Sequence, residues 1–439
     1  MANFPEILTT ESSGGLRGEI EIPSDKSISH RSLIIGALTH GRLKINNFSF
    51  GADCRSTLKI MEQLGVKVEF IDEKTLILDA TGGFKAPAEP LDCGNSGTTM
   101  RLMAGVLAGQ DFDSTLVGDE SLSKRPMKRV IEPLELMGAR IESNEGRAPL
   151  KIHGQSLKAI DYSSRIASAQ VKSCVLLAGL GAQGETIFSE PVLSRDHTER
   201  MLEYFGAEIE YVHGKIKIDP QSASDTHGSN ILKARDLTIA GDISSAAFFL
   251  VAGAIVPNSD FVIRNVGLNP TRTGILDVLH TMGADFEILS ARPVSNEPVG
   301  DIRIRYSPNL CATEILGDII PRLIDEIPAI AVLASQAQGK TIIKDAQDLR
   351  NKESDRINAV TKELQKLGVK ITEMPDGFEI EGKAAITPNG ELLETYHDHR
   401  LAMSWFLAGL ISEKPFKING FQWAATSFPE FLDLFYSLA

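Results

Sequence analysis

One segment pattern recurs along the whole chain and constrains the fold more than any other feature of the sequence. A helix-like run ends in glycine and passes directly into a strand-like run five times, at Gly65, Gly138, Gly206, Gly283 and Gly368. Glycine suits the left-handed position that ends a helix. The glycines lie roughly 70 to 85 residues apart, too far for a solenoid repeat, so each repeat has room for two helices and several strands. Segment 431–436 predicts a sixth such helix with no strand after it.

A second helix type alternates with the first. These segments are rich in small residues and apolar on almost every side; they are 32–38, 98–109, 170–180, 244–255, 327–337 and 400–410. Helices that are apolar all round are buried, so we expect an α/β fold with helices inside and sheets outside. A chain of 439 residues exceeds the size of one core. Two lobes of three repeats each place the boundary near Gly241.

Composition narrows the functional classes. The net charge of −13 argues against a general nucleic-acid surface, so any bound anion needs a local concentration of Lys and Arg. No apolar run is long enough to span a bilayer, and the first residues lack the pattern of a secretory signal. We therefore expect a cytoplasmic protein. Cys54, Cys93, Cys174 and Cys311 have no metal-ligand spacing and are expected to be idle thiols, with no metal bound.

The stretch 23–31 is the first of several candidate anion sites at helix starts. It joins a strand-like run to a buried helix, and Ser27 or Ser29 is expected to cap that helix. Free backbone N–H groups at the helix start, together with Lys26 and Arg31, would attract an anion. An ordinary helix start with solvated basic residues has the same pattern.

Similar polar clusters precede the other buried helices. The Gly-rich turn 94–98 could close its backbone amides on an anion, and Arg125 lies soon after it in a run of cations at 124–129. Segment 168–170 suits polyol recognition, whereas 194–198 also fits a plain cap. Asp325 and Glu326 fit the ordinary preference of carboxylates for helix starts. Segments 352–356 and 397–400 each combine an acid or imidazole with arginine.

Taken in order, these motifs resemble the 3-phosphoshikimate 1-carboxyvinyltransferase family of enolpyruvyl transferases. The motifs that carry the resemblance, over essentially the whole chain, are Lys26-Ser27-x-x-His30-Arg31, Gly94-Asn95-Ser96-Gly97-Thr98, Arg125-Pro126-Met127, Ser168-Ala169-Gln170, Lys352-Glu353-Ser354-Asp355-Arg356 and Asp398-His399-Arg400. The resemblance implies a two-lobed inside-out α/β barrel of six βαβαββ-type repeats. It assigns 26–241 to one lobe and 1–25 with 242–439 to the other. It also implies a monomer that needs no cofactor, nucleic acid or membrane.

The resemblance further implies the reaction and its residues: the enolpyruvyl group of phosphoenolpyruvate passes to the 5-hydroxyl of shikimate 3-phosphate, through a tetrahedral intermediate, with release of phosphate. Asp325 corresponds to the proton acceptor for that hydroxyl, Glu353 to a proton-transfer residue, and Lys26 and His399 to further catalytic candidates. The implied substrate-binding residues are Lys26, Ser27, Arg31, Asn95, Gly97, Thr98, Arg125, Ser168, Ala169, Gln170, Arg195, Asp325, Lys352, Arg356 and Arg400.

One departure and two alternatives accompany this interpretation. Thr426 occupies a position where some members carry a lysine that contacts phosphoenolpyruvate. The UDP-N-acetylglucosamine enolpyruvyl transferase shares the fold but has a reactive cysteine in the loop corresponding to 118–125, where this chain has none. A non-catalytic protein that binds phosphometabolites or nucleic-acid ends is the other alternative. Asp325 and Glu353 argue against it, because an anion binder gains nothing from carboxylates near its ligand.

Overall fold

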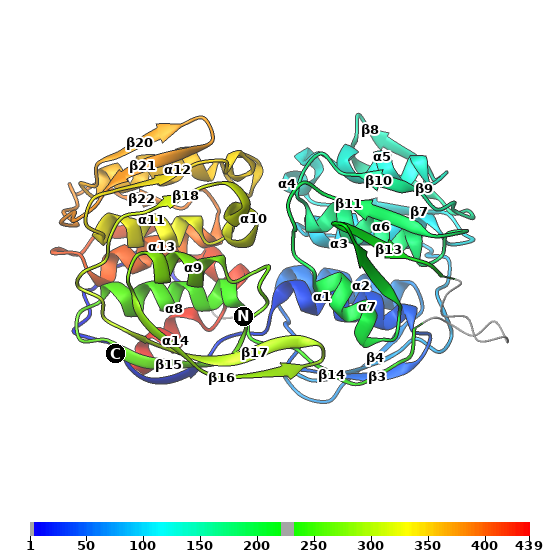
Figure 1. Cartoon of the computed structure of the whole chain (residues 1–439), viewed down its shortest axis with the longest axis horizontal. Helices are drawn as coiled ribbons and strands as arrows, with labels where there is room; N and C mark the ends of the chain where they lie inside the picture. Colours follow the sequence, from blue (N-terminus) through cyan, green and yellow to red (C-terminus); the bar gives the residue numbers. More distant parts are fainter. Residues whose placement is uncertain (1–3, 221–231) are drawn as a thin grey trace. The chain divides into compact units, whose positions relative to one another are not determined.

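The computed structural model describes residues 4–220 and 232–439 and divides the chain into two compact units. The N-terminal unit consists of Ser24–Ala240 with Pro293–Glu297. The C-terminal unit consists of Met1–Pro23, Gly241–Arg292 and Pro298–Ala439. In each unit the sheets lie outside and the helices inside (Figure 1), which confirms the predicted fold class.

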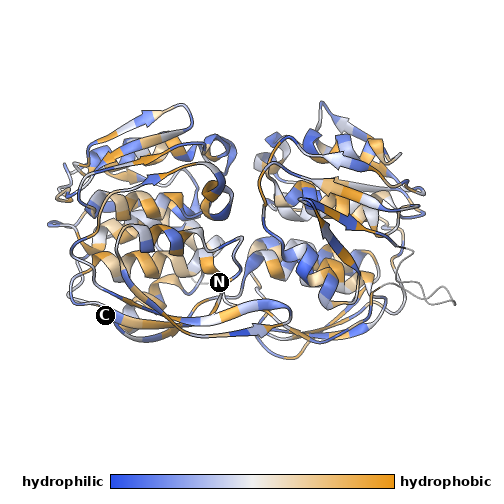
Figure 2. Cartoon of the chain, in the orientation of Figure 1, coloured by the Kyte–Doolittle hydropathy of each residue, from blue (hydrophilic) through white to orange (hydrophobic). Residues whose placement is uncertain are grey.

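The six predicted buried helices are present, three in each unit. They are α1 (Lys26–Leu38), α3 (Gly97–Ala108), α6 (Ala169–Gly179), α8 (Ile243–Ile255), α11 (Ile327–Gln336) and α13 (His399–Leu410). Almost every residue of α8 and α11 is buried, and both helices are apolar over most of their length (Figure 2). Burial of these helices forms the core of each unit.

The helices of the second set are amphipathic, and all but the last of them end at the recurring glycines. It consists of α2 (Ala52–Gln63), α5 (Lys128–Leu136), α7 (His197–Tyr204), α9 (Gly274–Thr281), α12 (Arg356–Lys366) and, at the end of the chain, α14 (Phe431–Leu438). All five glycines have positive φ, between 78° and 98°. At the first, Gly65 N donates to Glu62 O and Val66 N to Met61 O, and the other four glycines repeat this pair of bonds. Each of these five helices therefore ends in a Schellman motif.

The sheets share one pairing pattern. In the N-terminal unit they are β14-β3-β5-β4 (Leu237–Thr238, Arg42–Asn46, Leu76–Asp79, Lys67–Phe70), β6-β7-β9-β8 (Leu91–Asp92, Ser114–Val117, Arg147–His153, Arg140–Asn144) and β10-β11-β13-β12 (Asp161–Ser163, Thr186–Ser189, Lys215–Ile218, Ile209–Val212). In each, the first two strands named are parallel and the later pairs antiparallel.

The C-terminal unit repeats the pattern, with its last sheet reduced to three strands. Its sheets are β2-β15-β17-β16 (Arg17–Glu21, Asp260–Gly267, Glu297–Arg305, Asp285–Val294), β18-β19-β21-β20 (Glu314–Ile315, Lys340–Ile343, Gly377–Glu381, Ile371–Met374) and β22-β23-β1 (Leu393–Glu394, Lys417–Asn419, Ile7–Thr9). Strands β2 and β1, from the start of the chain, pair with β15 and β23. Short helices α4 (Glu120–Lys124), α10 (Ile320–Leu323), η1 (Gly317–Ile319), η2 (Gln347–Asn351) and η3 (Phe421–Thr426) complete the fold.

Residues at the tip of the β16–β17 hairpin belong to the N-terminal unit. Nδ1 of His197 lies 2.7 Å from Oε1 of Glu297, and both side chains are buried. The backbone N–H of Thr238 donates to Oγ of Ser295 at 2.9 Å. The N-terminal unit is therefore completed by five residues that are remote in sequence.

Gly105 lets α3 and α6 pack closely. A Cβ at this position would lie 2.3 Å from the carbonyl oxygen of Cys174, a backbone atom that cannot rotate away. We predict that Gly105→Ala destabilises the N-terminal unit, because overpacking costs about 1–3 kcal/mol and exceeds the roughly 1 kcal/mol that alanine gains in helix propensity. Urea denaturation measures the change. Gly181→Ala is the control, since nothing lies within 4 Å of its Cβ position; equal midpoints for the two variants would contradict the close approach.

Candidate functional site

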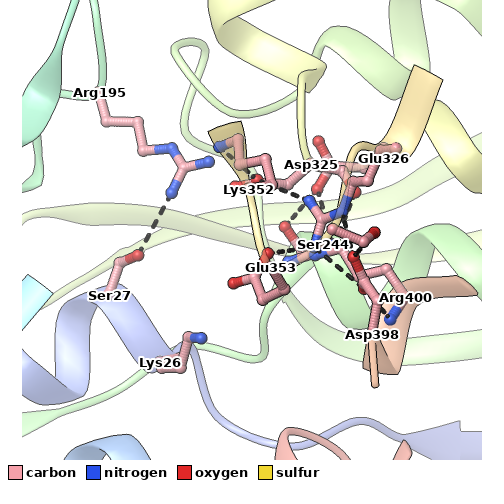
Figure 3. A network of polar contacts seen from close by, with 12 residues as sticks. Lys26, Ser27, Arg195, Ser244, Asp325, Glu326, Lys352, Glu353, Asp398 and Arg400 are labelled. Carbon is pink, nitrogen blue, oxygen red and sulfur yellow. Dashed lines mark hydrogen bonds and ion pairs between the residues drawn. The ribbon is translucent and has the colours of Figure 1, made fainter. Parts of the chain in front are cut away.

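Helix α1 presents Lys26, Ser27 and Arg31 from its first turns. Its cap is Asp25, whose carboxylate accepts from the backbone N–H of Ile28 at 2.8 Å. The expectation that Ser27 or Ser29 caps the helix is therefore wrong: both already lie inside it, and Asp25 is the last residue before its first turn. The hydroxyl of Ser27 accepts from Arg195 at 3.5 Å (Figure 3).

Arg31 is buried and held by three protein acceptors. Its guanidinium donates to Oγ1 of Thr198 at 2.7 Å, to Oγ of Ser173 at 2.8 Å and to the carbonyl oxygen of Ser27 at 3.0 Å. Burial lowers the pKa of Arg31 to about 10, so it stays charged at neutral pH. Arg31 is thus a fixed positive charge beside the start of α1.

Lys26 and His30 lie in the same sequence motif, 26–31, but in different environments. Lys26 forms an ion pair with Asp53 at 3.1 Å and remains partly exposed. His30 is fully buried; Nδ1 lies 2.7 Å from Oγ1 of Thr57, and burial lowers the pKa of His30 to about 3. His30 is therefore neutral at physiological pH and serves the packing of α1 against α2.

The Gly-rich turn before α3 is tied to two of the predicted ligands. Ser96 caps the helix by accepting from Thr99 N at 3.1 Å. Arg125 donates to Oδ1 of Asn95 at 2.6 Å. Nε2 of Gln170 donates to Oγ1 of Thr98 at 3.1 Å.

Arginine side chains also crowd Gly97. A Cβ there would lie 2.8 Å from Nη1 of Arg101 and 3.6 Å from Nη1 of Arg125. Arg101 donates to Oε1 of Gln170 at 2.6 Å. The Gly-rich turn 94–98 thus forms a helix N-terminus with two guanidinium groups close to it. This arrangement favours the binding of an anion.

The start of α6 places Ser168, Ala169 and Gln170. Ser168 is the N-cap residue, but its side chain makes no capping hydrogen bond. Its backbone N–H donates to Oε2 of Glu190 at 3.2 Å. Its hydroxyl is therefore not committed to the helix end.

In the C-terminal unit, cations surround Asp325 (Figure 3). Its carboxylate lies 3.1 Å from Nζ of Lys352, 3.7 Å from Arg356 and 4.0 Å from Arg272. Its carbonyl oxygen accepts from Arg400 at 2.9 Å. Three cations thus lie within 4.0 Å of this one carboxylate.

Arg356 is the most enclosed cation of this cluster. It pairs with Asp398 at 2.8 Å and with Glu353 at 2.6 Å. Burial alone would raise the pKa of Asp398, but Arg356 outweighs burial and holds that pKa below its ordinary value. Asp398 also caps α13 by accepting from the backbone N–H of Arg400. His399, the first residue of α13, is buried beside this cap.

Four further residues join this cluster, and none of them was among the site residues expected from the sequence. Arg272 is buried and lies 3.5 Å from Asp242, the cap of α8. It donates to the hydroxyl of Ser244, which in turn donates to buried Glu326. The only sequence signal for Arg272 is its place in the polar stretch 269–273 between β15 and α9.

Two further properties of the described residues are their arrangement as possible metal ligands and their hydropathy as possible membrane spans. Across residues 4–220 and 232–439, no group of three or more His, Cys, Asp or Glu side chains is arranged to hold a metal ion. Within the same described ranges, no helix is long and apolar enough to cross a membrane. All four cysteines are free, and Cys311 is exposed. Thr426 ends η3 with its side chain exposed.

We predict that Asp398→Asn destabilises the C-terminal unit at neutral pH by about 3–5 kcal/mol, because Arg356 loses a buried partner. A depressed pKa gives stability that is present above about pH 4 and is lost as the pH falls through the folded-state value. The difference between wild type and variant should therefore shrink on acidification. Chemical denaturation at pH 7 and pH 3.5 measures it, with exposed Glu413→Gln as control. A gap that is constant with pH would rule out the ion pair as its source.

Comparison with solved structures defines the class. The enolpyruvyl transferase NikO from Streptomyces tendae has a TM-score of 0.80 at 16% identity, with 98% of this chain and 97% of that chain covered, so the two share the fold. EPSP synthase from Acinetobacter baumannii has a TM-score of 0.86 at 41% identity, with 99% and 98% covered. The fold is that of the enolpyruvyl transferases.

Sequence comparison gives the family. The model of EPSP synthase (3-phosphoshikimate 1-carboxyvinyltransferase) matches residues 10–435. The 3-phosphoshikimate 1-carboxyvinyltransferases of Citrifermentans bemidjiense and Bacillus licheniformis are each 50% identical, over 430 and 427 residues, with 97% of both chains covered. The chain belongs to the EPSP synthase family, whose enzymes transfer the enolpyruvyl group of phosphoenolpyruvate to shikimate 3-phosphate in the shikimate pathway. This confirms the reaction predicted from the motifs and does not support UDP-N-acetylglucosamine as acceptor.

Proposed function

We propose that the polar clusters at the helix starts bind the two substrates of this transfer and carry out its chemistry. The proposed ligands of shikimate 3-phosphate are Lys26, Ser27, Arg31, Ser168, Ala169, Gln170, Arg195 and Lys352. The proposed ligands of phosphoenolpyruvate are Lys26, Gly97, Arg125, Gln170, Arg356 and Arg400, with Asn95 and Thr98 beside them. Two phosphates and a carboxylate need several cations, and these sets supply them.

The observation that carries the proposal is the placement of two carboxylates among cations in the C-terminal unit. Asp325 lies 3.1 Å from Lys352, and Glu353 lies 2.6 Å from Arg356. A protein that only binds anions would be weakened by these negative charges. An addition–elimination reaction needs them, because one group must accept a proton while another supplies one.

In the addition step, the 5-hydroxyl oxygen bonds to C2 of phosphoenolpyruvate, Asp325 accepts the hydroxyl proton, and Glu353 supplies a proton to the methylene carbon. In the elimination step, Glu353 accepts a proton from the new methyl group, the double bond re-forms as the bond between C2 and the phosphate oxygen breaks, and phosphate departs. Lys26, which pairs with Asp53, and His399 are the further catalytic candidates. Cationic groups around the departing phosphate would stabilise its developing charge.

We also propose a monomeric enzyme that acts in the cytoplasm and needs neither nucleic acid nor a membrane. The free state of all four cysteines supports a reducing compartment. The lobes 26–241 and 1–25 with 242–439 are proposed as its folding domains. Size-exclusion chromatography with light scattering tests the monomer.

The central experiment measures phosphate release from phosphoenolpyruvate with each of two acceptors. Shikimate 3-phosphate should support turnover, and UDP-N-acetylglucosamine should not. The reverse result would overturn the assigned acceptor. Binding of both shikimate 3-phosphate and phosphoenolpyruvate without phosphate release would favour the non-catalytic alternative.

We predict that Asp325→Asn lowers kcat by about 10² or more, the usual contribution of a positioned base. Asparagine keeps the size of the side chain and one acceptor oxygen, so calorimetric binding of shikimate 3-phosphate should change far less. Steady-state kinetics compare this variant with Asp318→Asn, an exposed carboxylate of the same unit. Near-normal kcat in Asp325→Asn would remove this residue from the mechanism and leave Glu353 as the next candidate.

We predict a different effect for Arg125→Ala. Loss of a charge-assisted contact worth about 1.5–3 kcal/mol should raise KM for phosphoenolpyruvate about ten-fold or more. The same kinetic measurement, with half-buried Arg129→Ala from the same run of cations as control, tests this role. An unchanged KM would show that Arg125 supports Asn95 rather than binding the substrate.

A further inference from the structure

Lys172 belongs to the same helix start as three proposed substrate ligands, yet it cannot be a ligand itself. Its side chain on α6 is fully buried. Nζ lies 2.8 Å from Oε1 of Glu199 and 3.0 Å from Oε1 of Glu190, and it donates to the carbonyl oxygen of Ser194 at 3.0 Å. A lysine ammonium has three donors and no acceptor. The ammonium therefore has three partners within the protein, one hydrogen-bonded carbonyl oxygen and two ion-paired carboxylates.

The first partner, Glu190, joins two substrate-binding segments. It follows strand β11, and its side chain is also buried. Oε2 accepts from the backbone N–H of Ser168 at 3.2 Å. Oε1 accepts from the backbone N–H and the hydroxyl of Ser194, at 2.8 and 2.9 Å. The position of Glu190 therefore fixes both the start of α6 and the loop that leads to Arg195.

The second partner, Glu199, has its carboxylate fully enclosed on α7. Burial raises the pKa of Glu199, and Lys172 opposes this rise. Burial would lower the pKa of Lys172, but Glu199 and Glu190 outweigh burial and raise it. The ammonium is charged at every pH at which the enzyme would work.

Arg31 is a second buried cation in the region of Lys172, Glu190 and Glu199. It donates to Ser173 and Thr198, the residues next to Lys172 and Glu199 in sequence. Two cations and two carboxylates therefore lie together in the N-terminal unit. Removal of Lys172 would leave two enclosed carboxylates facing one cation, and their repulsion and desolvation would loosen the segments that they hold.

We propose that Lys172 is a positioning residue for shikimate 3-phosphate. Through Glu190 and Ser194 it holds Ser168 and Arg195 in the places from which they bind this substrate, and it does not touch the substrate. The inference rests on the proposed ligand roles of Ser168 and Arg195. A smaller dependence is expected for phosphoenolpyruvate, because among its proposed ligands only Gln170 lies at the start of α6, whereas Arg125 and Gly97 belong to other segments.

The test is Lys172→Met, which keeps the length of the side chain and removes its charge. The dissociation constant and KM for shikimate 3-phosphate should rise about ten-fold or more, because misplaced ligands bind poorly. KM for phosphoenolpyruvate should rise clearly less, because Gln170 is its single proposed ligand on α6. Calorimetry and steady-state kinetics give these values.

A second variant distinguishes weaker substrate binding from loss of folding. Lys172→Met combined with Glu199→Gln removes one buried carboxylate together with the cation. One buried cation, Arg31, then faces one buried carboxylate, Glu190. Its thermal midpoint should recover toward wild type. Its KM for shikimate 3-phosphate should stay raised, because Glu190 and Ser194 still lack the ammonium.

Lys366→Met is the matched control. Lys366 has the same kind of contacts: both carboxylate oxygens of Glu363, at 3.0 and 2.9 Å, and the carbonyl oxygen of Leu392 at 3.1 Å. It belongs to none of the proposed substrate sets. This variant should lose stability with no change in either KM.

The outcomes separate this inference from the proposed function. A wild-type enzyme that cannot use shikimate 3-phosphate would overturn the proposed function. A wild-type enzyme with normal activity, beside lysine variants that lose stability but keep the wild-type KM for shikimate 3-phosphate, would overturn only the role of Lys172. An equal rise in both KM values would also overturn it, since a general loss of structure would then explain the effect.

Discussion

A helix that is apolar on every face can be stable only when other elements surround it. Six helices of this chain have that property, and each unit meets the constraint by packing three of them together and placing sheets outside. Glycines at contact points such as Gly105 allow the close approach. Since the sides of these helices are occupied, their N-termini are the parts that can meet a ligand. The polar clusters at the starts of α1, α3, α6 and α13 follow from this arrangement.

A second consequence concerns charge. The chain is acidic overall, yet its candidate site depends on arginine and lysine. The structure pairs the buried cations with enclosed carboxylates: Arg356 with Asp398, and Lys172 with Glu199. Buried ions without such partners would be strongly destabilising. The acidic residues near the site therefore include some that hold the cations in place and others, such as Asp325, that are proposed to do chemistry.

The sequence was sufficient to predict the two helix types, the glycine-ended Schellman motifs and the class of fold, because these depend on local periodicity and on one backbone conformation. It also led to the motifs that the family comparison supports. It could not identify Asp25 as the cap of α1, because three neighbouring residues could each accept that bond. Nor could it place Arg272 or the partners of Lys172, since these contacts join segments far apart in the chain. A lysine in an apolar helix shows no sign in sequence of which carboxylates neutralise it.

Strand pairing also has a consequence for how the chain is made. Residues 24–240 contain every strand of their three sheets, including β14, which closes the first. As the ribosome extends the chain, these three sheets can form early. Strands β1 and β2 are synthesised before that unit, but their partners β23 and β15 emerge after it. Strand β2 therefore stays unpaired until the middle of the chain has been made, and strand β1 stays unpaired until translation of the chain is almost complete.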